Sequence, residues 1–138
     1  VMNGTNIIAF CCTHSAYQAA DLAGARRLHY PDSIRVVRVP CAGKVDLLHI
    51  LRAFEYGADG VLILACPEDS CRHLYGNLRA KKRVEYGVTI LDEIGIEKER
   101  LQMFTLGPNM AQQFVSIVSE MAKRIEELGP TPLRKVKR

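Results

Sequence analysis

The alternation of short apolar stretches with longer helical stretches constrains the fold of this chain more than any other feature. The run at 60–65 has no polar side chain, which is typical of a central strand covered on both faces. Strand and helix patterns alternate four times, with strands at 6–10, 34–39, 60–65 and 101–105 and helices near 16–28, 44–56, 74–94 and 110–128. Such a chain, with right-handed crossovers, is expected to form an α/β flavodoxin-like doubly wound parallel sheet.

The ends of several elements carry their own signals. The run at 34–39 is β-branched and partly alternating, as expected for an edge strand. Gly57 is placed to close the second helix. Asn109, with Gln112 three residues later, is in position to cap the last helix through a capping box.

Length and charge predict one globular domain with a short tail. The 138 residues are 48% hydrophobic, enough for a single core. Four of the 19 Lys and Arg residues lie within 134–138, and without them 15 basic residues face 15 acidic ones. We therefore expect a domain at 1–129 and an exposed basic tail at 130–138. The body has no basic surface interleaved with aromatic residues, so nucleic acid is not an expected partner.

The sequence also predicts the compartment. No cationic region precedes an apolar stretch at the start of the chain, and no apolar run reaches membrane-spanning length. We expect a cytoplasmic protein without membrane contact. Five cysteines, an odd number, do not suit a simple disulfide framework, and a reducing compartment favours metal binding or catalysis.

The cysteines are placed where predicted strands end. Cys11 and Cys12 follow the first strand, Cys41 the second and Cys66 the third, while Cys71 lies five residues past Cys66. Parallel strands bring their carboxyl ends to one edge of the sheet, so these thiols should converge. Convergent thiols suggest a soft metal or an iron–sulfur cluster. Adjacent residues of an extended chain point to opposite sides, so either Cys11 or Cys12 should face the site and the other the core.

Two other chemistries use the same cysteines. Zinc could bind in a scaffold subunit, although structural zinc sites commonly use two tight ligand pairs and only Cys66 and Cys71 form one here. Cys66 and Arg72 match the C-x5-R pattern of a phosphatase-like thiol enzyme with Cys66 as nucleophile. The carboxylates at positions 68 and 69 disfavour a bound phosphate dianion. His14 and His73 are near the predicted edge, where they could donate hydrogen bonds to the ligands.

Several ordered motifs resemble a known family. They are AFCC at 9–12, RVPCAGKVD at 38–46, AFEYGADGV at 53–61, C-x4-C at 66–71 and GN at 76–77. In this order and spacing they resemble the methyl-viologen-reducing hydrogenase delta-subunit family over about residues 5–128.

The resemblance implies a small [2Fe–2S] electron-transfer subunit without independent catalysis. It implies electron transfer between a hydrogenase or formate dehydrogenase-type subunit and the flavin subunit of a heterodisulfide reductase, where electron bifurcation occurs. The implied cluster ligands are Cys12, Cys41, Cys66 and Cys71, with Cys11 as the alternative to Cys12. Many members read C-C-N-W-C where this chain has CCTHS at 11–15. Four thiols remain without one at position 15, so we expect the cluster to survive.

Overall fold

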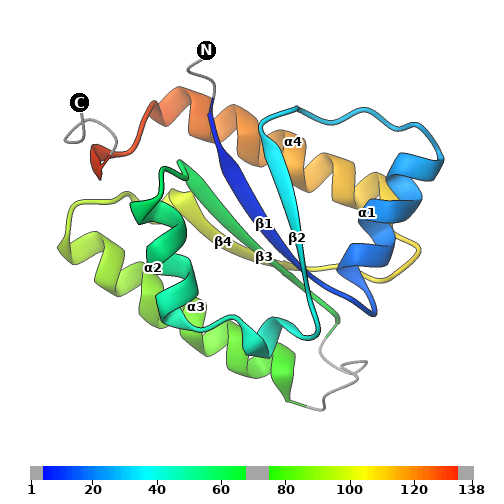
Figure 1. Cartoon of the computed structure of the whole chain (residues 1–138), viewed down its shortest axis with the longest axis horizontal. Coiled ribbons are helices and arrows are strands. Elements are labelled where there is room, and N and C mark those ends of the chain that lie inside the picture. Colours follow the sequence, from blue (N-terminus) through cyan, green and yellow to red (C-terminus); the bar gives the residue numbers. More distant parts are fainter. Residues whose placement is uncertain (1–4, 68–74, 134–138) are drawn as a thin grey trace.

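The computed structural model describes residues 5–67 and 75–133, which form an α/β domain around a four-stranded sheet (Figure 1). All neighbouring strands are parallel, and their order is β2-β1-β3-β4. This arrangement confirms the predicted flavodoxin-like doubly wound sheet. The strands are β1 (Ile7–Cys12), β2 (Ile34–Val39), β3 (Gly60–Ala65) and β4 (Leu101–Thr105).

Helices cover both faces of the sheet. One face packs against α1 (Ala16–Ala25) and α4 (Ala111–Leu128). The other packs against α2 (Leu47–Glu55) and α3 (Gly76–Glu93), so the domain has two apolar cores, one on each side (Figure 1). Two 3-10 turns, η1 (Ala42–Lys44) and η3 (Lys98–Arg100), precede α2 and β4.

The position of each strand follows its hydrophobic pattern. Every residue of β3 is buried, as predicted for a central strand. β2 lies at an edge, where Arg35, Val37 and Arg38 are exposed to solvent. Charged side chains on an edge strand oppose pairing with another sheet, so this edge is protected.

Two helices end in the same hydrogen-bonded motif. Gly57 adopts φ 111° after α2, where the Ala58 amide donates to the Ala53 carbonyl at 3.0 Å, so the predicted stop is confirmed. After α1 the left-handed position is taken by Arg27 with φ 56°, and the Leu28 amide donates to the Ala23 carbonyl at 2.9 Å. This Schellman motif ends α1 before the predicted residue 28.

The predicted cap of α4 is wrong. The N-cap is Met110, it makes no side-chain cap hydrogen bond, and Asn109 is exposed. The Met110 thioether sulfur instead accepts a hydrogen bond from the Gly107 amide at 3.0 Å. The turn at 107–110 therefore closes on itself before the helix begins, which leaves no capping role for Asn109.

The segment after α4 returns to the body of the domain. Thr131 is fully buried, and its amide donates to the Asp59 carboxylate at 3.2 Å. The same carboxylate accepts the Asn6 amide at 2.9 Å, just before β1. The expectation of an exposed tail from residue 130 is therefore wrong for 130–133, while 134–138 lie outside the described residues. In the part of the chain that the structure describes, no helix is long and apolar enough to cross a bilayer.

Candidate metal centre

Three cysteine-bearing segments meet at the carboxyl edge of the sheet. In the strand register, Cys12 lies beside Val39 of β2, and Cys11 lies beside Leu64 of β3. Cys41 and Cys66 each come two residues after those partners. Neighbouring strands are about 4.8 Å apart, so the structure places cysteines from three adjacent segments at one edge.

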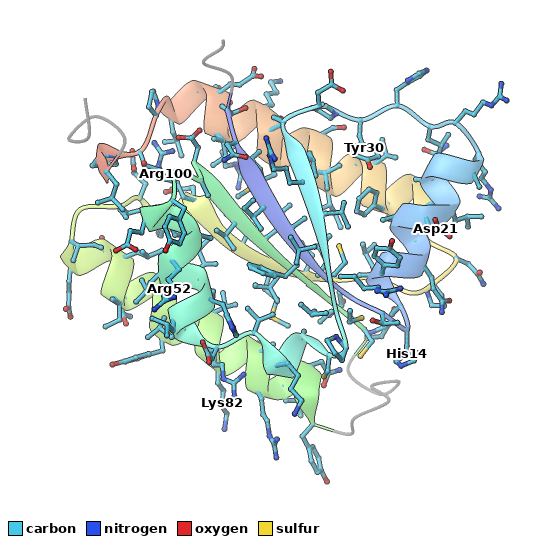
Figure 2. The ribbon with its side chains drawn as sticks, viewed as in Figure 1. His14, Asp21, Tyr30, Arg52, Lys82 and Arg100 are labelled. Atoms are coloured by element: carbon cyan, nitrogen blue, oxygen red, sulfur yellow. The ribbon has the colours of Figure 1, made fainter. Side chains whose placement is uncertain are left out.

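These cysteines share an edge without forming a compact ligand group among the described residues. Cys11, Cys12, Cys41 and Cys66 are all buried, with exposed fractions of 0, 4, 5 and 8%. Within residues 5–67 and 75–133, no three His, Cys, Asp or Glu side chains are grouped so as to hold a metal ion. Cys71 lies outside these ranges, together with Arg72 of the C-x5-R pattern and His73. His14 is exposed at this edge (Figure 2).

The adjacent cysteines at the end of β1 differ in environment. The Cys11 thiol is fully buried and donates to the Ala9 carbonyl, with 3.7 Å between sulfur and oxygen. Desolvation, followed by the influence of Cys12, raises the pKa of Cys11 from 9.0 to about 12. Its hydrogen bond to the Ala9 carbonyl directs the Cys11 thiol back along β1.

The turn that carries Cys41 is fixed against α3. The Gly43 amide donates to the Cys41 sulfur at 3.4 Å. A β-carbon on Gly43 would lie 2.8 Å from the Gly76 Cα and 2.9 Å from its carbonyl oxygen. The Arg83 guanidinium donates to the carbonyls of Gly43 and Val45, the latter at 3.2 Å. Only glycine allows this close approach of the Cys41 turn to the helix.

The segment after β3 is held by the same helix. The side-chain amide of Asn77, which is buried, donates to the Cys66 carbonyl at 3.3 Å and to the Pro67 carbonyl at 2.8 Å. The first turn of α3 therefore positions the segments of both Cys41 and Cys66. Sequence reasoning did not assign this role to Asn77, although the GN pair at 76–77 marks the start of the helix.

Ser15 is the last residue of the CCTHS motif at 11–15. Its side chain is buried, and its hydroxyl donates to the Leu106 carbonyl, just after β4. Ser15 is also the N-cap of α1, yet its hydroxyl makes no cap hydrogen bond. The hydroxyl thus connects the start of α1 to the chain beyond β4.

A substitution tests the contact between the Cys41 turn and α3. Gly43→Ala would force backbone atoms apart, because the nearest atoms to the new methyl group belong to the Gly76 main chain. We expect the free energy of unfolding to fall by about 2 kcal/mol, measured by urea denaturation. Gly24→Ala is the matched control, since no atom lies within 4 Å of a β-carbon there. Equal stability of the two variants would contradict the proposed constraint.

The fold and the site define a class of protein, namely small α/β domains with buried cysteines at the carboxyl edge of a parallel sheet. Cysteine thiolates are ligands that suit soft metals and iron–sulfur clusters. The chain belongs to the family of the methyl-viologen-reducing hydrogenase delta subunit, whose model matches residues 7–129.

Individual relatives are similar over almost the whole chain. The vhu iron-sulfur subunit of the F420-non-reducing hydrogenase of Methanocaldococcus jannaschii is 48% identical over 128 residues, covering 93% of this chain and 96% of the relative. The corresponding vhu iron-sulfur subunit of Methanococcus maripaludis is 46% identical with the same coverage. A polypeptide of the ferredoxin:CoB-CoM heterodisulfide reductase of Methanosarcina mazei is 38% identical over 90% of this chain, which is 16% of that longer protein.

Proposed function

We propose that this chain is an electron-transfer subunit that binds a [2Fe–2S] cluster through Cys12, Cys41, Cys66 and Cys71. The observation that carries the proposal is the placement of buried Cys12, Cys41 and Cys66 at one edge of the sheet. Cysteine thiolates are the usual ligands of such clusters, so the donor type fits. The hydrogenase relatives are named as iron–sulfur subunits, which supports the same conclusion.

Within this ligand set, Cys12 is preferred to Cys11. The Cys11 thiol is fully buried and donates to the Ala9 carbonyl, back along its own strand. Cys11 is the penultimate residue of β1 and lies beside Leu64 in the strand register. Cys12 is the last residue of β1 and therefore lies closer to the segments that carry Cys41 and Cys66.

When bound, such a cluster accepts and releases one electron at a time. The chain itself would provide the ligands, exclude water by burying them, and hold the segments in place through Asn77 and Arg83. The Gly43 amide donates to the Cys41 sulfur, and hydrogen bonds to ligand sulfur favour the more negative, reduced state. No substrate needs to be bound or cleaved by this domain.

The hydrogenase and heterodisulfide reductase partners are proposed from the relatives, and the formate dehydrogenase-type donor and the flavin are proposed from the family resemblance. A hydrogenase- or formate dehydrogenase-type subunit would donate electrons in the cytoplasm, and the flavin-containing subunit of a heterodisulfide reductase would accept them. Relatives include subunits of F420-non-reducing hydrogenases. In Methanosarcina mazei a segment similar to this chain is part of a heterodisulfide reductase polypeptide itself. A covalent connection in a relative supports close association of the same two parts here.

Metal analysis tests the function directly. In protein purified without oxygen we expect about two irons and two acid-labile sulfides per chain, with an S = 1/2 EPR signal after dithionite reduction. Protein without iron that also fails reconstitution would contradict the proposal. Bound zinc would then indicate a scaffold subunit, and hydrolysis of an aryl phosphate would indicate the thiol enzyme.

A further inference from the structure

The outward face of α3 presents aromatic and basic side chains together. Tyr75 and Tyr86 are 63% and 60% exposed, and Leu78 is 37% exposed. Lys82 projects from this helix away from the body of the domain (Figure 2). A hollow of about 560 Å³ lies on the same face and is lined by Tyr75, Leu78, Arg79, Lys81, Lys82 and Glu85. We call these six residues the α3 face.

The large side chains of this face do not contribute to the core. The buried residues of α3 recur at helical spacing on the opposite side of the helix, at Asn77, Ala80, Val84, Gly87 and Leu91. Exposed tyrosine gains little from folding, whereas tyrosine and arginine are enriched where proteins bind other proteins. Tyr75 and Arg79 of the α3 face are of the types that are enriched at protein interfaces.

Its charge indicates the chemistry of the partner. The face carries three cations, Arg79, Lys81 and Lys82, against one carboxylate, Glu85. A surface of net positive charge is complementary to a surface rich in Asp and Glu. Tyr75 and Leu78 supply the apolar part of the α3 face, which is complementary to an apolar spot within such an acidic surface.

The α3 face is also close to the proposed cluster. Asn77, in the first turn of α3, donates to the Cys66 carbonyl, and Gly76 contacts the Cys41 turn at Gly43. Lys81 is four residues further along, roughly 6 Å in the direction of the helix axis. A protein bound here would lie beside the thiol edge.

We infer that the α3 face is the docking surface for an acidic surface of another protein subunit, with which this chain exchanges electrons. The inference rests on the proposed function, because a partner that exchanges electrons with the cluster must bind near the thiol edge. The partner is defined by its chemistry, a patch of Asp and Glu residues around an apolar spot.

Lysine footprinting and cross-linking test the inference. The complex is purified from the source organism through a tag on this chain, and acetylation of its lysines is compared with that of the isolated full chain. We expect Lys81 and Lys82 to be protected in the complex, while Lys98 and Lys123, which are exposed on other elements, react equally in both. A zero-length carbodiimide should join Lys81 or Lys82 to carboxylates of another subunit. If each of the four lysines is acetylated to the same extent in the complex as in the isolated chain, the inference is overturned. It is also overturned if the chain purifies without another subunit.

Charge reversal provides the second measurement. The double variant Lys81→Glu/Lys82→Glu should bind the other subunit at least about tenfold more weakly at low salt. The matched control Lys98→Glu/Lys123→Glu makes the same change in net charge and should bind like the wild type. Both variants are also tested for binding of a labelled single-stranded oligonucleotide. If only Lys81→Glu/Lys82→Glu loses oligonucleotide binding while its complex with the other subunit stays intact, the α3 face binds nucleic acid and the inference is overturned. Iron content separates the two proposals: absent iron contradicts the electron-transfer function, whereas unprotected lysines in an iron-containing complex contradict only the docking surface.

Discussion

Replacing Cys12 by serine should remove most of the visible absorption and acid-labile sulfide from anaerobically purified protein. The substitution takes away one of four thiolates, and serine oxygen is a poor substitute for a soft sulfur ligand. Cys12 is 4% exposed, so the smaller polar residue should lower the free energy of unfolding by only about 1–2 kcal/mol. Absorption between 350 and 600 nm, about the range of thiolate-to-iron charge transfer, reports the cluster, and circular dichroism reports the fold.

The neighbouring cysteine is the matched control. Cys11→Ala also removes one thiol, but this thiol is fully buried, donates to the Ala9 carbonyl and has a pKa raised to about 12. We expect unchanged iron and sulfide content and a stability loss of about 1–2 kcal/mol from the lost sulfur volume. Cluster loss in Cys11→Ala with retention in Cys12→Ser would assign the ligand to Cys11 instead.

Replacing Arg100 by methionine should destabilise the fold by about 3 kcal/mol. The Arg100 side chain is fully buried and donates to the carbonyls of Asp59 at 3.0 Å, Pro130 at 3.3 Å and Leu128 at 3.4 Å. Methionine fills much of the same volume but offers no donor, so these carbonyls would lose a partner. The effect should appear in urea unfolding, and limited proteolysis should cleave near 128–133 sooner than in the wild type.

Lys98→Met is the control for this substitution. Lys98 lies in the same 3-10 turn, carries the same charge and is exposed, so its replacement should change the free energy of unfolding by less than about 0.5 kcal/mol. Glu97, the ion-pair partner of Arg100, has 39% of its side chain exposed and can turn to water in Arg100→Met. Similar stability of both variants would show that the buried guanidinium contributes little to the attachment of the C-terminal segment.

Much of the fold could be predicted because short-range sequence patterns determine its strands and helices. The apolar run of β3 is buried along its whole length, and Gly57 closes α2 with a positive φ. Arg27 ends α1 in the left-handed conformation that glycine usually adopts, so the sequence contains no signal for that helix end. The buried Thr131 donates a hydrogen bond to Asp59, which is 72 residues away in the chain. Such a contact leaves no periodic pattern in the sequence.

The candidate site was likewise predictable from the sequence only in part. That Cys12, Cys41 and Cys66 reach one edge follows from where strands end, and the structure places them there. The supporting contacts of Asn77 and Arg83 are side-chain hydrogen bonds to backbone carbonyls up to 40 residues away. Such bonds depend on how two elements pack, and short-range spacing does not encode them. The ligand roles of Cys12, Cys41, Cys66 and Cys71 remain predictions.

The Asp59 carboxylate, which accepts amides from both Asn6 and Thr131, has a consequence for modular architecture. Both ends of the described domain are held at the start of β3, at the amino edge of the sheet, whereas the cysteines lie at the carboxyl edge. Domains whose ends lie close together tolerate insertion into longer polypeptides. A larger protein could therefore be continuous with such a unit without covering its thiols, and a similar segment makes up 16% of the longer heterodisulfide reductase polypeptide of Methanosarcina mazei.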